Sequence, residues 1–415
     1  MQGKALPGFR DFYPEDLQLR NHIFATWRSV ASRYGFEEYD GPPLESLEMY
    51  TKKSGEEIVQ QLYTFRDKGD REVALRPEMT PTLARMVAAR VQALKKPIRW
   101  FSIPQLFRYE RQQRGRLREH FQLNMDIIGE ASPLADAELM AAAIDIMRAL
   151  GLGPGDVQLR VSDRRLIRSL LLGRGVTEAQ LPTAFAVIDR CERVPKNILE
   201  EMLRESGFGS RESGAVFDVA TLRGSDALKA AGEVAEPLNQ AVQALESMGL
   251  GEFVSIDLTI VRGLAYYTGI VFELFDAQKE LRAIAGGGRY DGLLDLPALG
   301  FGMGDVVLGE LLKERGVAPK ASIELGAFLV AVGGEDMPTM LRLAHAMRER
   351  GIAVEYGLRH AGVRKQLELA SARGAARAVI IGPDERKAGL AVVKDLRAGT
   401  EAKVPIDKLL NGYFD

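Results

Sequence analysis

Cysteine and histidine are scarce in this chain, and their scarcity excludes two kinds of site. The single cysteine, Cys191, cannot form an internal disulfide, and this composition suits the reducing cytoplasm, where we expect the protein. We interpret Cys191 itself as a small buried apolar residue. The four histidines show no HExxH spacing and no CxxC pair occurs, so nothing resembles a zinc site and no protein-bound metal is predicted.

A strong net charge and long apolar runs are also lacking. The 55 lysines and arginines nearly balance the 57 aspartates and glutamates, so any contact with RNA must come from local basic patches. No apolar stretch reaches the roughly 18 residues that a transmembrane helix needs. The N-terminal residues lack the apolar segment of a secretory signal. We therefore expect no membrane association.

Apolar spacing predicts the elements of the first part of the chain. It predicts a helix over 17–34 and a second helix over 135–150. Between them, residues 99–128 alternate like two paired strands joined by an arginine-rich loop. Strand character returns at 253–284 and is followed by a glycine-rich run.

The order of these patterns predicts the domain organisation. A length of 415 residues is enough for two or three domains. A charged helical segment interrupts one sheet, and an alternating βαβ pattern follows a proline-containing linker. The fold class we predict is an α+β main domain, with an antiparallel sheet flanked by helices, plus a helical insertion and a C-terminal α/β domain. Their predicted ranges are 1–160 with 251–318, 161–250 and 326–415.

Arginines cluster in the predicted hairpin loop. They are Arg108, Arg111, Arg114, Arg116 and Arg118. A planar guanidinium binds phosphate oxygens in a bidentate manner, so such a loop suits a nucleoside triphosphate or an RNA end. The same arginines could instead form ion pairs with Glu110 and Glu119 on a solvated hairpin. Composition alone does not separate these interpretations.

Four segments carry a family resemblance. FRYE at 107–110, followed by GRLREHFQ, resembles motif 2 of class II aminoacyl-tRNA synthetases, and the 17–43 region resembles their motif 1, which builds a dimer interface. VRGLAYYTG at 261–269 and AGGGRYD at 285–291 are similar to the two signatures peculiar to histidyl-tRNA synthetases. The tail from 326 resembles the anticodon-binding domain that several class II enzymes share.

The resemblance, with LRPEMT at 75–80, runs from residue 4 to about 312. It implies a cytoplasmic, homodimeric histidine-tRNA ligase that uses ATP with Mg²⁺, L-histidine and tRNA(His). One alternative is a catalytically silent paralogue that regulates ATP phosphoribosyltransferase in histidine biosynthesis; such paralogues generally lack the C-terminal domain. A second alternative is a class II synthetase for proline, threonine or glycine, against which the two histidyl signatures argue.

The resemblance also implies roles on the ATP side of the site. Activation brings two anions together, so the site needs fixed positive charge more than an acid or a base. Arg108 would hold the α-phosphate and the substrate carboxylate, and Arg262 would act from the opposite side. Arg116 and Arg118 would reach the outer phosphates, and Glu110 would contact the adenine or orient the loop.

On the histidine side, the resemblance implies a polar pocket. Positions that match the family's contacts to the ammonium and the ring are Glu78, Thr80, Gln122, Asp126, Tyr266 and Tyr290, with Tyr267 beside them. A carboxylate in an apolar strand, such as Asp126, usually has a partner. Other interpretations remain for single residues: a surface salt bridge for Glu78, core packing for Tyr266 and Tyr267, and a tight turn for the GGGRYD glycines.

The sequence departs from the family pattern at two places. Motif 3 normally carries a Glu-Arg pair, whereas this chain has Asp305-Val306, and Ala265 replaces an acidic residue. A variant branch that includes plant organellar-type enzymes resembles the chain at both positions. Our hypothesis is that an arginine of the 114–118 loop, or a bound Mg²⁺, neutralises the γ-phosphate instead.

The tail has a basic bias along one helix and its preceding loop. The residues concerned are Arg359, His360, Arg364, Lys365, Arg373 and Arg377. Such a patch can follow RNA phosphates while loop residues contact unstacked anticodon bases. A solvated helix face explains the same charges.

Overall fold

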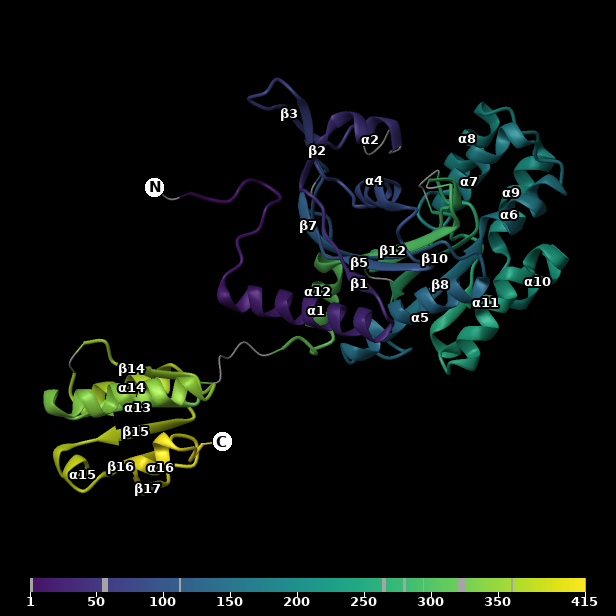
Figure 1. Cartoon of the computed structure of the whole chain (residues 1–415). Helices are drawn as coiled ribbons and strands as arrows, with labels where there is room; N and C mark the ends of the chain where they lie inside the picture. Colours follow the sequence, from purple (N-terminus) through teal and green to yellow (C-terminus); the bar gives the residue numbers. More distant parts are fainter. Residues whose placement is uncertain are drawn as a thin grey trace. The chain divides into compact units, whose positions relative to one another are not determined.

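The computed structural model describes residues 3–53, 59–111, 113–262, 266–278, 281–293, 295–319, 325–359 and 361–414. The chain divides into two compact units, 1–319 and 320–415, and each is described by itself (Figure 1). None of the described helices has both the length and the apolar character needed to cross a membrane.

A large mixed sheet forms the centre of the first unit. Within the described residues its strands are β1 (Glu37–Glu38), β5 (Ile98–Ser102), β6 (Gln105–Phe107), β7 (Glu119–Ile128), β8 (Val157–Asp163), β9 (Val254–Ile256), β10 (Ile270–Asp276), β11 (Ala285–Arg289) and β12 (Ala298–Gly304). Their order is β1-β5-β7-β12-β11-β10-β8-β9, with β6 beside β7. Neighbours are antiparallel except β1 with β5 and β8 with β9. The predicted antiparallel sheet flanked by helices is confirmed, with a parallel pair at each edge.

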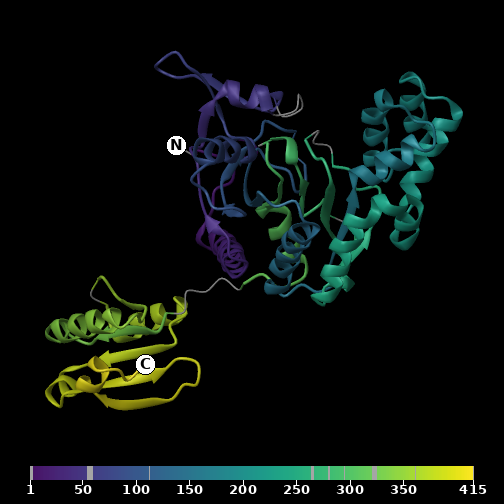
Figure 2. The same cartoon turned by 45° about the vertical axis from the view of Figure 1, so that its right-hand side comes forward.

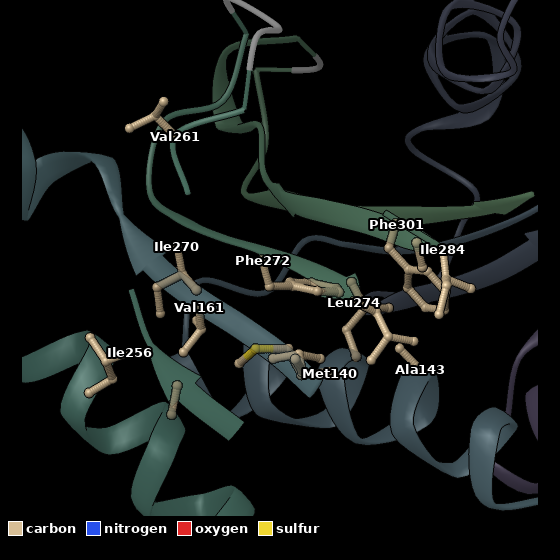
Figure 3. Close-up of a cluster of buried hydrophobic side chains, with 14 of the residues drawn as sticks. Met140, Ala143, Val161, Ile256, Val261, Ile270, Phe272, Leu274, Ile284 and Phe301 are labelled. Atoms are coloured by element: carbon tan, nitrogen blue, oxygen red, sulfur yellow. The ribbon is translucent and has the colours of Figure 1, made fainter. Parts of the chain in front are cut away.

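One face of the sheet packs on helices and forms the main core. These helices are α1 (Pro14–Arg33), α5 (Pro133–Ala149) and α12 (Asp305–Glu314). Side chains alternate between the two faces of a strand, and Phe272 and Leu274 of β10 point toward Met140 of α5 (Figure 3). Phe301 of β12 joins the same cluster. The side chains of the intervening residues in each strand therefore point to the opposite face of the sheet.

The opposite face carries a smaller layer (Figures 1 and 2). Its elements are β2 (Leu44–Ser46), α2 (Leu47–Lys53), β3 (Tyr63–Arg66), β4 (Glu72–Leu75) and α4 (Thr80–Arg90). The three strands form a separate sheet in the order β2-β4-β3. Leu83 and Val87 of α4 are buried against Ile98 and Ile128 of the large sheet, so α4 closes one end of this face.

A helical segment follows β8 and leads into β9. Its helices are α6 (Arg164–Leu172), η1 (Glu178–Gln180), α7 (Leu181–Arg190), α8 (Lys196–Glu205), α9 (Ser210–Thr221), α10 (Gly224–Ala231), η2 (Gly232–Ala235) and α11 (Glu236–Ser247). Strand β8 continues to Asp163, whose side chain caps α6 by accepting from the backbone N–H of Arg165 at 2.8 Å. The helices therefore begin at Arg164. Whether 161–250 behaves as a domain of its own stays a prediction.

Short turns complete the first unit, and a five-stranded sheet forms the second. The turns are η3 (Gly251–Phe253) and η4 (Asp291–Leu293). The second unit contains β13 (Ala327–Ala331), η5 (Gly334–Asp336), α13 (Met337–Glu349), β14 (Val354–Tyr356), α14 (Val363–Ala372), β15 (Arg377–Ile381), α15 (Pro383–Lys387), β16 (Leu390–Asp395), β17 (Glu401–Pro405) and α16 (Ile406–Leu410). The strand order is β14-β13-β15-β16-β17; the first three are parallel and the last two antiparallel to their neighbours. The predicted α/β tail is confirmed.

We predict that Phe272→Ala destabilises the first unit by about 3–5 kcal/mol, because it empties a site that is only 2% exposed in the main core. Both tryptophans, Trp27 and Trp100, lie in this unit, so tryptophan fluorescence in a urea titration reports its unfolding alone. Leu134→Ala is the matched control, because Leu134 is 63% exposed, and we expect it to cost less than about 0.5 kcal/mol. Equal losses for the two variants would contradict this placement of the core.

Candidate active site

Two cavities lie on the face of the large sheet that is opposite the main core. The larger has a volume of about 670 Å³ and the smaller about 90 Å³. Arg108, Gln122, Arg262, Gly286 and Gly302 line both. Two arginines predicted to carry the chemistry therefore stand where the cavities meet. Among the described residues, no group of three or more His, Cys, Asp or Glu side chains is arranged to hold a metal ion.

Glycines of β11 and β12 form the floor of this junction. A Cβ at Gly300 would lie 2.0 Å from Oδ1 of Asp126, and one at Gly286 would lie 2.3 Å from Nη1 of Arg262. Gly302 lies against the amide of Gln122 in the same way. Glycine here lets neighbouring side chains lie flat across the strands. The GGGRYD glycines belong to strand β11, so the interpretation as a tight turn is wrong.

Asp126 and Tyr290 form a buried pair in the small cavity. Asp126 is 6% exposed, and the Tyr290 hydroxyl donates to its Oδ1 at 2.5 Å. Burial raises the pKa of Asp126 to about 7, while the hydrogen bond from Tyr290 acts to lower it. Burial and the facing carboxyl raise the pKa of Tyr290 well above its ordinary value. The small cavity thus contains a carboxyl group whose pKa is near neutral, beside a hydroxyl that is held in place.

The remaining walls of the small cavity come from separate segments. They include Glu78, Thr80, Asn124, Tyr266 and Tyr267. Glu78 is only 6% exposed, so its interpretation as a surface salt bridge is wrong. The rings of Tyr266 and Tyr267 lie 4.9 Å apart, and both pack in an apolar cluster as well as lining the cavity. These tyrosines therefore pack in the core and also line the cavity, while their contact with a substrate stays a prediction.

Hydrogen bonds hold the loop that carries Glu78 against the large sheet. Arg76 is buried and donates to Asp40 and to the carbonyl of Gly41, each at 2.7 Å. Nε of Arg108 donates to the carbonyl of Pro77 at 2.9 Å. The motif 2 strand and the Glu78 loop are thereby fixed to each other.

Arg262 is held in an uncommon backbone conformation. Its φ is 56°, in the left-handed region that non-glycine residues rarely adopt. Arg164, the first residue of α6, donates to the carbonyls of Val261 at 2.7 Å and Arg262 at 3.1 Å. The Arg262 guanidinium donates to Glu273 at 2.5 Å. Burial acts to lower the pKa of Arg262, but Tyr267 and Glu273 raise it above its ordinary value. The guanidinium is therefore charged and fixed.

The arginine hairpin divides its charges between the cavity and the surface. Arg116 lines the large cavity and binds Glu110 at 2.5 Å. Arg114 instead pairs with Glu314 of α12, which is neither of the two carboxylates predicted to pair with this loop, whereas the pair of Arg116 with Glu110 is one that the solvated-hairpin interpretation predicted. Arg118 lies over the ring of Tyr109, with 4.0 Å between guanidinium carbon and ring centroid, and lines neither described cavity. Its predicted contact with ATP stays a prediction.

Sequence reasoning missed several cavity residues. They are His120, Asn124, Arg160, Asp189, Glu192, Arg193 and Arg282. His120 and Asn124 share the face of β7 that carries Gln122 and Asp126, so a period of two residues is the signal that could have found them. Burial, with nearby Arg108 and Arg10, lowers the pKa of His120 to about 3, so it is uncharged.

The motif 3 region holds a carboxylate in place but offers no cation. Asp305 accepts from Arg10 at 2.9 Å and from the backbone N–H of Phe121 at 2.9 Å. Val306 lines the large cavity. Ala265, the other departure from the family pattern, lies outside the described residues.

Comparison with known proteins gives the family. The family model for histidyl-tRNA synthetase matches residues 8–304, and one for an anticodon binding domain matches residues 327–412. The chain belongs to the histidyl-tRNA synthetase family. A histidine–tRNA ligase from Opitutus terrae is 42% identical, with 98% of this chain and 97% of that protein covered. A chloroplastic/mitochondrial histidine–tRNA ligase from Arabidopsis thaliana is 40% identical, with 97% and 85% covered.

Solved structures of synthetases share the fold. Histidyl-tRNA synthetase from Nostoc sp. PCC 7120 superposes with a TM-score of 0.84 at 24% identity, covering 99% of this chain and 98% of that one. A structure described as an ATP phosphoribosyltransferase regulatory subunit/histidyl-tRNA synthetase from Bacillus halodurans C gives 0.77 at 23% identity, covering 92% and 98%.

We predict that Asp126 makes folding stability fall as pH rises. Its folded pKa of about 7 lies above the value of about 3.9 expected in the unfolded chain, so the folded state keeps a proton that the unfolded state loses. Relative to Asp126→Asn, the free energy of unfolding of the wild type should fall by about 1.4 kcal/mol per pH unit between about pH 4 and pH 7. Above that range it should fall no further.

Tryptophan-monitored urea titrations of both proteins at pH 5, 6, 7 and 8 measure this difference. Tyr290→Phe removes a hydrogen bond that lowers the pKa of Asp126. In that variant, the pH above which stability stops falling should therefore be higher than 7. A wild-type minus Asp126→Asn difference that does not change with pH would refute the assignment.

Proposed function

We propose that this chain activates L-histidine with ATP to histidyl-adenylate and then transfers histidine to the 3′ end of tRNA(His). The observation that carries the proposal is the meeting of the two cavities at Arg108 and Arg262. The substrate carboxylate and the α-phosphate are both anions, and two fixed cations at one junction favour their approach. Membership of the histidyl-tRNA synthetase family supports the same reaction.

On the ATP side, we assign the large cavity to the nucleotide. Arg108 bridges the α-phosphate and the carboxylate, and Arg262 faces them from the other wall. Arg116 reaches the outer phosphates, while Glu110 orients Arg116 through their 2.5 Å ion pair or contacts the adenine. Mg²⁺ enters with ATP as part of the substrate.

On the histidine side, we assign the imidazole to the small cavity. The Asp126 carboxylate accepts from one ring nitrogen, and the Tyr290 hydroxyl keeps that carboxylate in place. Tyr266 and Tyr267 flank the ring. The ammonium group takes the contacts predicted from the sequence, with Glu78, Thr80 and Gln122. An apolar isostere could not donate to the buried Asp126 carboxylate, which would then keep only its hydrogen bond from Tyr290, and this loss is the basis of strong rejection.

The first step needs no protein acid or base. A carboxylate oxygen of histidine attacks the α-phosphorus, the bond to the bridging oxygen breaks, and pyrophosphate leaves. Positive charge from Arg108 and Arg262 offsets the charge that develops on the α-phosphoryl oxygens. In the second step, a terminal ribose hydroxyl of the tRNA attacks the carbonyl carbon and AMP leaves; the phosphate of the adenylate or the tRNA itself takes the proton.

We assign 326–415 to anticodon binding, 161–250 to a helical insertion and the remainder to the catalytic domain. The family model for an anticodon binding domain supports the first assignment. Arg364 pairs with Glu368 at 3.0 Å and Arg373 with Glu355, so part of the predicted basic patch is already engaged within the tail. His360 lies outside the described residues. We further propose a homodimer, through the region that resembles motif 1, and a cytoplasmic location.

ATP–pyrophosphate exchange, run separately with each of the twenty amino acids, tests the activation step. We expect exchange with histidine alone, and we expect Asp126→Asn to raise the KM for histidine about 10- to 100-fold with an unchanged KM for ATP, because it removes a buried charged acceptor. Exchange with another amino acid would support a different class II synthetase. No exchange in folded protein would support the regulatory alternative.

Removing residues 326–415 tests the tail separately. Because 1–319 is a compact unit, we expect the shortened protein to keep histidine-dependent exchange while charging of tRNA(His) is lost. Exchange and charging are measured on the same preparations, with the full chain as control. Charging at the full-length rate would rule out an anticodon role for the tail.

A further inference from the structure

The charged side chains around the large cavity are almost all paired with one another. Its lining arginines are Arg108, Arg116, Arg160, Arg193, Arg262 and Arg282. Arg116 pairs with Glu110, Arg160 with Glu192, Arg193 with Asp189 and Arg262 with Glu273. Arg108 also lies 4.0 Å from Glu110. Within the described part of the chain, Arg282 forms no ion pair.

Arg282 is also repelled by its surroundings. Burial lowers the pKa of Arg282, and so does the positive charge of Arg116 and Arg193, while Glu110 alone acts to raise it. Arg282 is exposed, so water tolerates its charge in the free protein, but the neighbouring cations favour an anion bound beside it. The large cavity is the space into which such an anion would fit, because Arg282 lines it.

The register of the sheet places Arg282 beside the start of α12. Ala285 of β11 pairs with Met303 of β12, and the backbone N–H of Gly304 donates to the carbonyl of Ile284 at 3.3 Å. Arg282 lies three residues before β11, and Val306 lies two residues after β12, in the first turn of α12, so the pairing of these strands brings the two segments to the same end of the sheet. Both side chains line the same cavity. Arg282 therefore shares this cavity with the position at which the sequence lacks the motif 3 arginine.

We propose that Arg282 binds the terminal phosphates of ATP and so provides, from the segment that precedes β11, the positive charge that Val306 cannot supply. This inference rests on the proposed activation reaction. The hairpin arginines fit the role less well, since Arg114 pairs with Glu314, Arg118 lies on Tyr109, and Arg116 is neutralised by Glu110. Arg116 remains a second contact to the outer phosphates, near enough for its charge to lower the pKa of Arg282.

Binding of ATP, pyrophosphate and AMP to the full chain, measured by titration calorimetry, separates the phosphates involved. We expect Arg282→Ala to weaken ATP and pyrophosphate about 10- to 100-fold, because a charge-assisted contact to phosphate is lost. AMP affinity should stay within twofold, since AMP has no terminal phosphates. Arg282→Lys should lie between, because lysine keeps the charge without the bidentate geometry.

Two further variants sharpen the test. Arg114→Ala is the matched control, because its side chain pairs with α12, and it should leave ATP affinity unchanged. Adding Val306→Arg to the Arg282→Ala chain should restore most of the lost ATP affinity. An Arg282→Ala protein that binds ATP normally, or that loses ATP and AMP equally, would overturn the proposal.

The exchange assay keeps this inference distinct from the proposed function. If the wild type shows no histidine-dependent exchange, the activation reaction fails, while the difference between ATP and AMP binding still decides the role of Arg282. If the wild type exchanges and Arg282→Ala keeps its KM for ATP, the reaction stands and the assignment of Arg282 is wrong. Arg282 is exposed, so its substitution is not expected to unfold the chain.

Discussion

The close approach of side chains to the backbone of β11 and β12 is the constraint on which the site depends. Asp126 and Arg262 lie across these strands at positions where even a methyl group would overlap them. Glycine weakens a strand because it adds no packing, so its repeated use in the middle of a sheet needs a compensating reason. The reason here is that the two cavities join over this floor, and a Cβ on either strand would displace a residue assigned to one substrate.

The opposite face of the same strands supplies the stability that the glycines do not. Leu299, Phe301 and Met303 alternate with the floor glycines of β12 and are buried in the main core with α5. A slip of one residue would exchange the two faces, putting apolar side chains into the cavities and glycine into the core. The core therefore fixes the register, and the register fixes which side chains meet at the site.

Residues whose signal is local could be predicted from the sequence, whereas residues defined by distant pairing could not. Asp126 stood out because a carboxylate in an apolar strand needs a partner, and its partner is Tyr290. Glu78 is buried in a loop that Arg76 joins to Asp40, and local spacing does not reveal such a distant contact. Spacing also could not divide the hairpin arginines, because the partner of Arg114 is Glu314, far along the chain. The role proposed for Arg282 depends on the pairing of β11 with β12, which no local pattern in the sequence reveals.

The helical segment and the junction of the cavities are coupled through Arg164. This residue opens α6, and its guanidinium binds the two carbonyls that flank the left-handed turn at Arg262. Such a backbone conformation costs on the order of 1–3 kcal/mol and persists only when surrounding contacts determine it. Burial acts to lower the pKa of Arg164, consistent with a cation that spends its hydrogen bonds on neutral carbonyls. A movement of α6 would therefore change the backbone that holds Arg262, which gives the helical segment a direct physical connection to the proposed activation step.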